Sequence, residues 1–140
     1  FTNMTSQAPE QNEMMNEPTP PLYCSRGFTI TELVKIYARY CKDLADPEEI
    51  WIEGYDEFLF YRSDIEIRKN ELTPELTAEV RRNDAIVLEK AYKYLEEYEF
   101  GIGLLEDSYR RKRYPLSHWW WYVDKIHNGD LPKPDLSLPV

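Results

Sequence analysis

Apolar side chains recur every three or four positions between residues 28 and 45, which is the spacing of one face of an α-helix. Thr29 and Glu32 open this pattern at the spacing of a capping box, in which each side chain accepts a hydrogen bond from the other residue's backbone N–H. The sequence Ala-Asp-Pro at 45–47 ends the pattern, because proline cannot continue a helix. We therefore predict a helix over this range. Its core-facing positions are Ile30, Leu33, Val34, Tyr37, Cys41 and Leu44.

Residues 50–67 permit two interpretations. Asp46, Pro47 and Glu49 provide the start signals of a second helix, and an apolar stripe at helical spacing follows them. Short strands on either side of Gly54 are the alternative. We favour the helix because the caps indicate one and no hairpin turn signal separates the two apolar runs. The stripe consists of Trp51, Tyr55, Phe58, Leu59, Arg62 and Ile65.

The longest helical pattern covers residues 72–100. Thr73 is placed to cap it, and Pro74 occupies the first turn, where a helix tolerates proline. Asn83 and Asp84 interrupt its apolar face near the middle. The apolar positions of this face are Leu76, Val80, Val87, Ala91, Tyr94, Leu95 and Tyr98.

Two shorter helices are predicted after this pattern. Residues 104–113 continue as a helix until Pro115 stops it. Ser117 can cap a last helix over residues 118–128, and Gly129 closes it as a left-handed residue.

These elements predict an all-α protein, a small bundle of four or five helices with extended N- and C-terminal arms. Residues 1–27 are polar and proline-punctuated, a composition typical of a disordered or extended arm. Residues 28–129 form the predicted helical domain. Residues 130–140 are proline-spaced and are predicted to be an extended tail.

The chain of 140 residues carries a formal net charge of −9, which argues against nucleic acid or anionic lipid binding over its whole surface. No apolar run approaches the roughly 18 residues that a membrane span needs, and residues 1–27 lack the features of a secretory signal. Cys24 and Cys41 match no metal or redox spacing and are predicted to be free thiols. We therefore expect a cytoplasmic protein without a membrane span.

Ionisable side chains indicate no catalytic or metal centre. His118 and His127 are the two histidines of the chain, which is too few for the paired Glu-x-x-His motifs of a di-iron bundle. Cys41 falls on an apolar stripe, where cysteine behaves as a small core residue. No glycine-rich phosphate loop is present. The sequence therefore predicts no catalytic residue, no metal ligand and no cofactor.

Arg113 and His118 are separated by four residues, and this spacing resembles the Arg-x4–6-His motif of HEPN-type ribonucleases, which are small helical proteins. The resemblance covers these two residues, and Pro115 lies between them, where the family has continuous helix. It implies an arginine that holds phosphate and a histidine that acts in metal-independent RNA cleavage across a dimer. A cation stabilises the charged phosphorane, while imidazole moves the proton near neutral pH.

Three consecutive tryptophans, at 119–121, follow the cationic run. Successive helix positions turn by about 100°, so the three indoles point in different directions. We expect Trp119 and Trp120 to fill the core and Trp121 to reach the surface, where tryptophan beside arginine is typical of an interface hot spot. The alternative is that all three rings are core. The predicted partner-binding residues are Trp120, Trp121, Arg110, Arg111, Arg113, Tyr98 and Tyr109.

These features favour a non-enzymatic protein-binding adaptor, or a regulatory or assembly subunit, that acts through an aromatic-rich helical surface and extended arms. Its expected partner is another protein or a larger assembly, and nucleic acid is not expected. Two alternatives belong to other classes. One is the HEPN-like metal-independent ribonuclease, and the other is an acidic nucleic-acid mimic that inhibits a basic protein.

Overall fold

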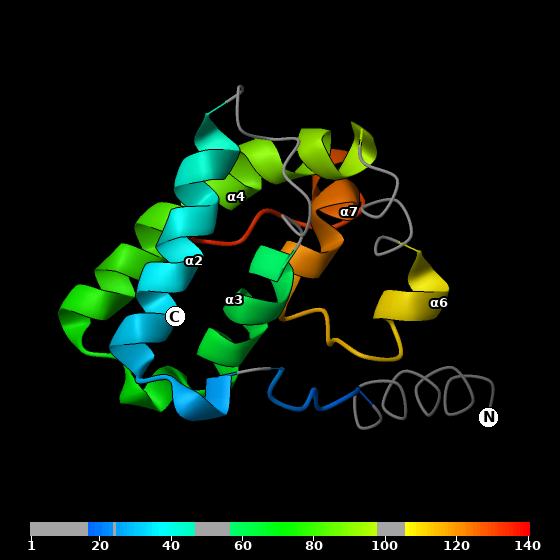
Figure 1. The fold of residues 1–140 in the computed structure, drawn as a ribbon. Coiled ribbons are helices and arrows are strands. Elements are labelled where there is room, and N and C mark those ends of the chain that lie inside the picture. The colour runs from blue at the N-terminus through cyan, green and yellow to red at the C-terminus, as the bar shows by residue number, and fades with distance from the viewer. Residues whose placement is uncertain (1–16, 24, 47–56, 98–105) are drawn as a thin grey trace.

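A computed structural model describes residues 17–23, 25–46, 57–97 and 106–140, and within them the protein is all-helical, with no strand. Figure 1 shows α2 and α3 side by side, with α4 crossing behind α2 and α7 on the far side of α3. This small bundle with extended arms is the predicted architecture. The elements are η1 (Ser25–Gly27), α2 (Ile30–Ala45), α3 (Phe58–Ile67), η3 (Lys69–Glu71), α4 (Pro74–Glu97), α6 (Asp107–Arg110), η4 (Trp119–Tyr122) and α7 (Val123–His127).

Helix α2 begins at the predicted capping box. The Glu32 backbone N–H donates to Thr29 Oγ1 at 3.1 Å, and the Thr29 N–H donates to Glu32 Oε1 at 2.8 Å. Its apolar face packs against α3 and α4. Cys41 lies in this core, as predicted, and burial raises the pKa of its thiol well above the usual range. The buried residues of α2 are Leu33, Val34, Tyr37, Cys41 and Leu44.

Helix α3 confirms the helical interpretation for the part of the ambiguous segment that is described. Residues 58–67 are α-helical, whereas residues 47–56, which contain Pro47 and Glu49 of the predicted start signals, lie outside the described residues. Phe58, Leu59 and Ile65 are fully buried. Polar residues are also buried on this helix, and they form the hydrogen-bond networks of the next subsection.

Helix α4 begins at Pro74, and the Leu76 N–H donates to Thr73 Oγ1 at 3.2 Å, which confirms the predicted cap. Asn83 and Asp84 do not break the helix, although they interrupt its apolar face. Both are buried. The apolar positions buried around them on α4 are Val80, Val87, Ala91 and Leu95.

Both described arms lie against the bundle. The Tyr23 N–H donates to Asp64 Oδ1 at 2.7 Å, and the Tyr23 ring stacks on Phe60 at a centroid distance of 4.4 Å. The C-terminal tail, red in Figure 1, runs back toward α4, where Arg81 donates to the carbonyl oxygens of Leu138 and Pro139 at 2.9 and 3.0 Å. Residues 1–16 of the predicted N-terminal arm lie outside the described residues.

The last two helices are shorter than predicted. Helix α6 ends at Arg110 and the chain then turns through residues 111–113, because the Tyr114 N–H bonds the Arg110 carbonyl before Pro115 forces an extended backbone. The tryptophans lie in the 3-10 helix η4 rather than in one continuous α-helix, and Ser117 does not cap it. Gly129 adopts the predicted left-handed conformation, with φ of 84°.

Candidate functional site

All three consecutive tryptophans are buried, so the prediction that Trp121 reaches the surface is wrong. The exposed fractions are 9% for Trp119 and 0% for both Trp120 and Trp121. Tyr114 stacks on the Trp121 ring at 4.1 Å, and Phe60 meets it edge-on at 5.1 Å. Trp121 is therefore covered from one side by the turn after the cationic run and from the other by α3.

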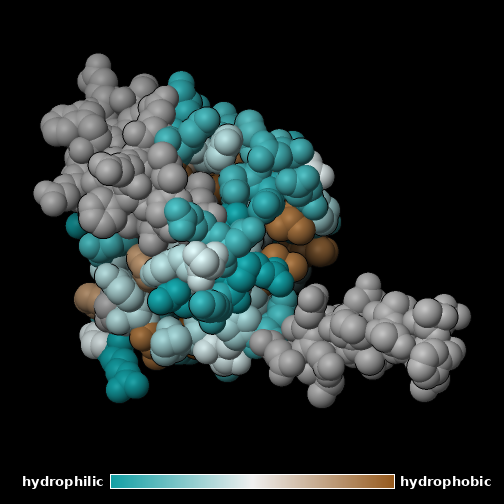
Figure 2. Space-filling model, turned by 90° about the vertical axis from the view of Figure 1, so that its right-hand side faces the viewer, coloured by the Kyte–Doolittle hydropathy of each residue, from teal (hydrophilic) through white to brown (hydrophobic). Residues whose placement is uncertain are grey.

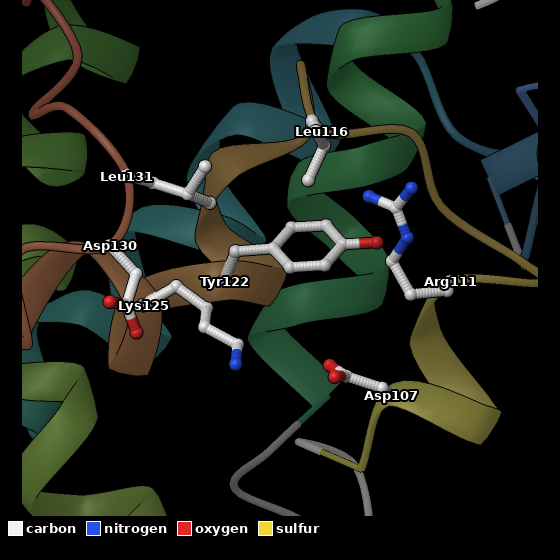
Figure 3. Close-up of a pocket in the computed structure, with 7 residues that line it drawn as sticks. All are labelled: Asp107, Arg111, Leu116, Tyr122, Lys125, Asp130 and Leu131. Carbon is white, nitrogen blue, oxygen red and sulfur yellow. The ribbon is translucent and has the colours of Figure 1, made fainter. Parts of the chain in front are cut away.

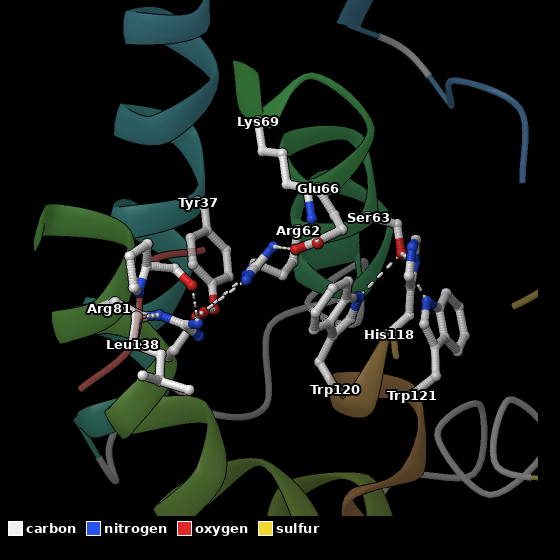
Figure 4. Close-up of polar contacts among 12 residues, drawn as sticks. Tyr37, Arg62, Ser63, Glu66, Lys69, Arg81, His118, Trp120, Trp121 and Leu138 are labelled. Atoms are coloured by element: carbon white, nitrogen blue, oxygen red, sulfur yellow. Dashed lines mark hydrogen bonds and ion pairs between the residues drawn. The ribbon is translucent and has the colours of Figure 1, made fainter. Parts of the chain in front are cut away.

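One serine hydroxyl joins two of these indoles to a histidine (Figure 4). Ser63 Oγ lies 2.9 Å from Trp120 Nε1, 3.0 Å from Trp121 Nε1 and 2.9 Å from His118 Nδ1. Indole N–H groups can only donate, so the hydroxyl oxygen accepts both bonds and its own proton points to Nδ1. His118 is therefore the neutral tautomer that carries its proton on Nε2. We call Ser63, His118, Trp120 and Trp121 the serine hub.

Burial lowers the pKa of His118 to about 4, from the ordinary histidine value of 6.5. The unfolded chain then binds a proton between these two values that the folded chain does not, so stability falls as pH is lowered through this window. We expect His118 to remove about 2–3 kcal/mol from the free energy of unfolding between pH 7 and pH 4.5. Urea unfolding at both pH values measures this loss.

The matched comparison for this effect uses the exposed His127. His118→Gln should make the unfolding free energy less dependent on pH over this range, whereas His127→Gln should leave the wild-type dependence unchanged. Carboxylates contribute equally in all three proteins. Equal pH dependence in wild type and His118→Gln would contradict the proposed protonation state.

A second buried network joins α2, α3 and α4 (Figure 4). Arg62 donates through Nε to Asp84 Oδ1 at 2.8 Å and through its second terminal nitrogen to Oδ2 at 3.1 Å. The Tyr37 hydroxyl donates to the same carboxylate at 2.6 Å, and Arg81 reaches it at 3.1 Å. The Arg62 guanidinium also lies 4.1 Å from the Trp120 ring centroid, so this network touches the serine hub. Burial, followed by the Asp84 charge, raises the pKa of Tyr37 well above its usual range.

Arg110, predicted to be available to a partner, is instead buried with an exposed fraction of 1%. It donates to the Trp121 carbonyl oxygen at 2.9 Å, to Asp107 at 2.9 Å and to Asp124 at 3.0 Å. Its guanidinium lies 4.8 Å from the Tyr122 ring centroid. The physical reason for its burial is that two carboxylates and a backbone carbonyl compensate the charge. Arg110 therefore fastens α6 to η4 and α7.

The other predicted partner-binding residues occupy different environments. Arg113 is exposed, donates to the Tyr109 carbonyl at 2.9 Å and lies 4.0 Å from the Tyr109 ring centroid. Tyr109 is half-buried and 6.2 Å from Trp121. Arg111 is exposed. Tyr98 lies outside the described residues.

A surface pocket of about 340 Å³ lies where α6 is fastened to α7, and we call it the α6–α7 pocket (Figure 3). The Tyr122 ring lies at its centre in this view, with Leu116 and Leu131 on one side of the ring. The Tyr122 hydroxyl donates to the Tyr114 carbonyl at 2.7 Å, which fixes the ring. The lining residues are Asp107, Arg111, Leu116, Tyr122, Lys125, Asp130 and Leu131.

The lining of the α6–α7 pocket carries two cations, Arg111 and Lys125, and two carboxylates, Asp107 and Asp130. Arg111 and Lys125 form no salt bridge with any described residue. Asp107 is already bound by Arg110, and this hydrogen bond lowers the pKa of Asp107. Arg111 and Lys125 also act electrostatically on Asp107, whereas Asp130 and Arg111 lie on opposite sides of the Tyr122 ring in Figure 3. Figure 2 shows one face of the molecule, on which hydrophilic residues predominate and apolar residues form separate patches.

Sequence reasoning found Arg111 but missed the rest of the pocket. Leu116 directly follows Pro115 in a turn, and a large apolar residue there was a usable signal. No pattern in the sequence indicates which residues lie beside Lys125. Leu131 comes from the tail, so its position depends on how that segment returns to the bundle.

No protein-family description matches this chain, and neither a curated protein nor a solved structure is significantly similar to it. In the described residues, no group of three or more His, Cys, Asp or Glu side chains is placed to hold a metal ion. None of the described helices combines the length and apolar character that a bilayer crossing requires. The functional interpretation therefore depends on the geometry of the pocket and its surroundings.

Proposed function

We propose that this chain is a non-enzymatic adaptor, or a regulatory or assembly subunit, that binds another protein through the α6–α7 pocket. The observation that carries the proposal is the preformed pocket itself, with leucines inside and two cations at its edge that form no salt bridge with a described residue. An apolar centre with a polar rim is the usual composition of a protein interface. The pocket adjoins the cationic segment 110–113 that the sequence singled out.

The alternatives have less support. A ribonuclease would need His118 to reach RNA, but its exposed fraction is 5% and its Nδ1 is engaged by Ser63. No described feature favours an acidic nucleic-acid mimic. We propose a cytoplasmic location, which suits the buried free thiol of Cys41.

Photo-crosslinking at Leu116 tests the proposal. A benzoyl-phenylalanine placed at this position should yield a discrete protein adduct on irradiation in native lysate, and mass spectrometry would identify the adduct. Ile67 is a matched control because its exposed fraction of 38% is almost the same as the 37% of Leu116, while it lies at the end of α3. The same adduct should not form from position 67.

Arg111→Glu in the Leu116-labelled protein should reduce the adduct, because it reverses one of the two cations that line the pocket. The proposal fails if position 116 yields no protein adduct, or if positions 116 and 67 yield the same adducts in equal amounts.

A further inference from the structure

We propose that the α6–α7 pocket recognises an acidic protein segment that inserts one leucine-sized side chain beside Leu116 and Leu131. This inference rests on the proposed function and specifies the partner chemistry of the same site. Its occupant is a peptide segment that combines an apolar anchor with carboxylates on either side.

The apolar half of the argument comes from what lines the inside of the pocket. Leu116 is 37% exposed, which leaves apolar surface in contact with water. Leu131 is half-buried and packs against the hydrophobic core, and the Tyr122 ring beside the two leucines is held by its bond to Tyr114. A cavity of about 340 Å³ is at the small end of ligand pockets, so it suits one side chain with its flanking backbone.

The charged half of the argument comes from the cations that line the pocket. Arg111 and Lys125 line the pocket without a salt bridge to any described residue, and Asp130 can offset only one of them. Lys112 and Arg113 are exposed just beyond it. The guanidinium of Arg111 can bind a carboxylate through two parallel hydrogen bonds. Residues 111–113 and Lys125 thus place four cations in and next to a lining that holds two carboxylates, on a chain whose formal charge is −9.

The difference in charge between this face and the rest of the chain also directs where an acidic segment can bind. An acidic segment is repelled by most of a molecule with this net charge and is attracted only where cations gather. A nucleic acid would meet the same cations, but its phosphates offer no aliphatic group for the space between Leu116 and Leu131. The two halves of the pocket together favour an acidic peptide.

Fluorescence anisotropy with defined peptides tests this inference on the purified chain. The probe is fluorescein-labelled Asp-Glu-Leu-Asp-Glu, compared with the same peptide carrying serine for leucine and with Asn-Gln-Leu-Asn-Gln. We expect both altered peptides to bind at least about tenfold more weakly than the acidic leucine peptide. A short thymidine oligonucleotide is the third competitor.

Matched variants assign the binding to the pocket. Arg111→Glu/Lys125→Glu and Leu116→Asp should each weaken binding by about tenfold or more. The charge control is Lys35→Glu/Lys42→Glu, which reverses two exposed lysines of α2, and the apolar control is Ile67→Asp. Both controls should bind within about twofold of wild type. Circular dichroism and thermal melting confirm that each variant is folded before it is compared.

Several outcomes would overturn the inference. These are equal binding of the neutral and acidic peptides, equal loss in the control variants, or no binding of any peptide at millimolar concentration. Tighter binding of the oligonucleotide, lost in the same pocket variants, would assign the site to nucleic acid instead. If Leu116 still captures a protein by crosslinking while the acidic peptide fails, the proposed function stands and only this partner chemistry is rejected.

Discussion

Asp84→Ala is expected to lower the free energy of unfolding by about 3–5 kcal/mol, which is a large share of the stability of a domain this size. The substitution removes the carboxylate that accepts hydrogen bonds from Tyr37, Arg62 and Arg81. Arg62 is 1% exposed, so its charge would stay buried with only Glu66 beside it. Urea denaturation followed by circular dichroism measures the change.

Two comparisons separate this effect from a general weakening of α4. Glu79→Ala removes a carboxylate from the same helix, but its partner Arg82 is well exposed, so the loss should not exceed about 1 kcal/mol. Arg62→Met/Asp84→Leu should recover part of the stability lost in Asp84→Ala, because no charge is left unpaired. A loss below about 1 kcal/mol in Asp84→Ala would show that the buried charge finds another partner.

Ser63→Ala is expected to cost about 3 kcal/mol or more, although it removes a single oxygen atom. The hydroxyl of Ser63 is the acceptor for both Trp120 and Trp121 and the donor to His118. Each buried polar group left without a partner costs about 1–3 kcal/mol, and His118 can recover only by finding another donor for Nδ1. Denaturant unfolding gives the magnitude.

Ser108→Ala is the matched control for this substitution, since Ser108 is exposed on α6. It should change the free energy of unfolding by less than about 0.5 kcal/mol. Tryptophan emission should also shift in Ser63→Ala, because the indole N–H groups of the serine hub lose their acceptor. Unchanged stability together with unchanged emission would mean that the hub does not hold the indoles in place.

The parts of the fold that sequence predicted correctly are those set by local signals. Helix α2 has a capping box and a regular apolar face, and α4 has a Thr-Pro start, so both are specified by neighbouring residues. Both members of the Arg62–Asp84 pair were visible in the sequence. Arg62 is a cation on one apolar stripe, and Asp84 interrupts another. Their pairing still could not be predicted, because it depends on how α3 and α4 are placed relative to each other.

The candidate site was harder to predict because loops build most of it. The expectation for Trp121 assumed an α-helix turning by about 100° per residue, whereas η4 is a 3-10 helix and Tyr114 from the preceding turn covers the ring. The spacing of apolar residues also cannot predict that Leu131, in the tail, packs back against the bundle. Composition located the cationic segment that contains Arg111, but it gave no sign of the pocket that Arg111 lines.

Arg110 has a consequence for any association at this face. Its bonds to Asp107, Asp124 and the Trp121 carbonyl set the walls of the pocket while the chain folds. The residues of the pocket therefore lose their conformational entropy on folding, before any ligand binds. The entropy cost that remains on binding is that of ordering the incoming peptide. A short flexible peptide can then bind the α6–α7 pocket with useful affinity, even though the interface is small.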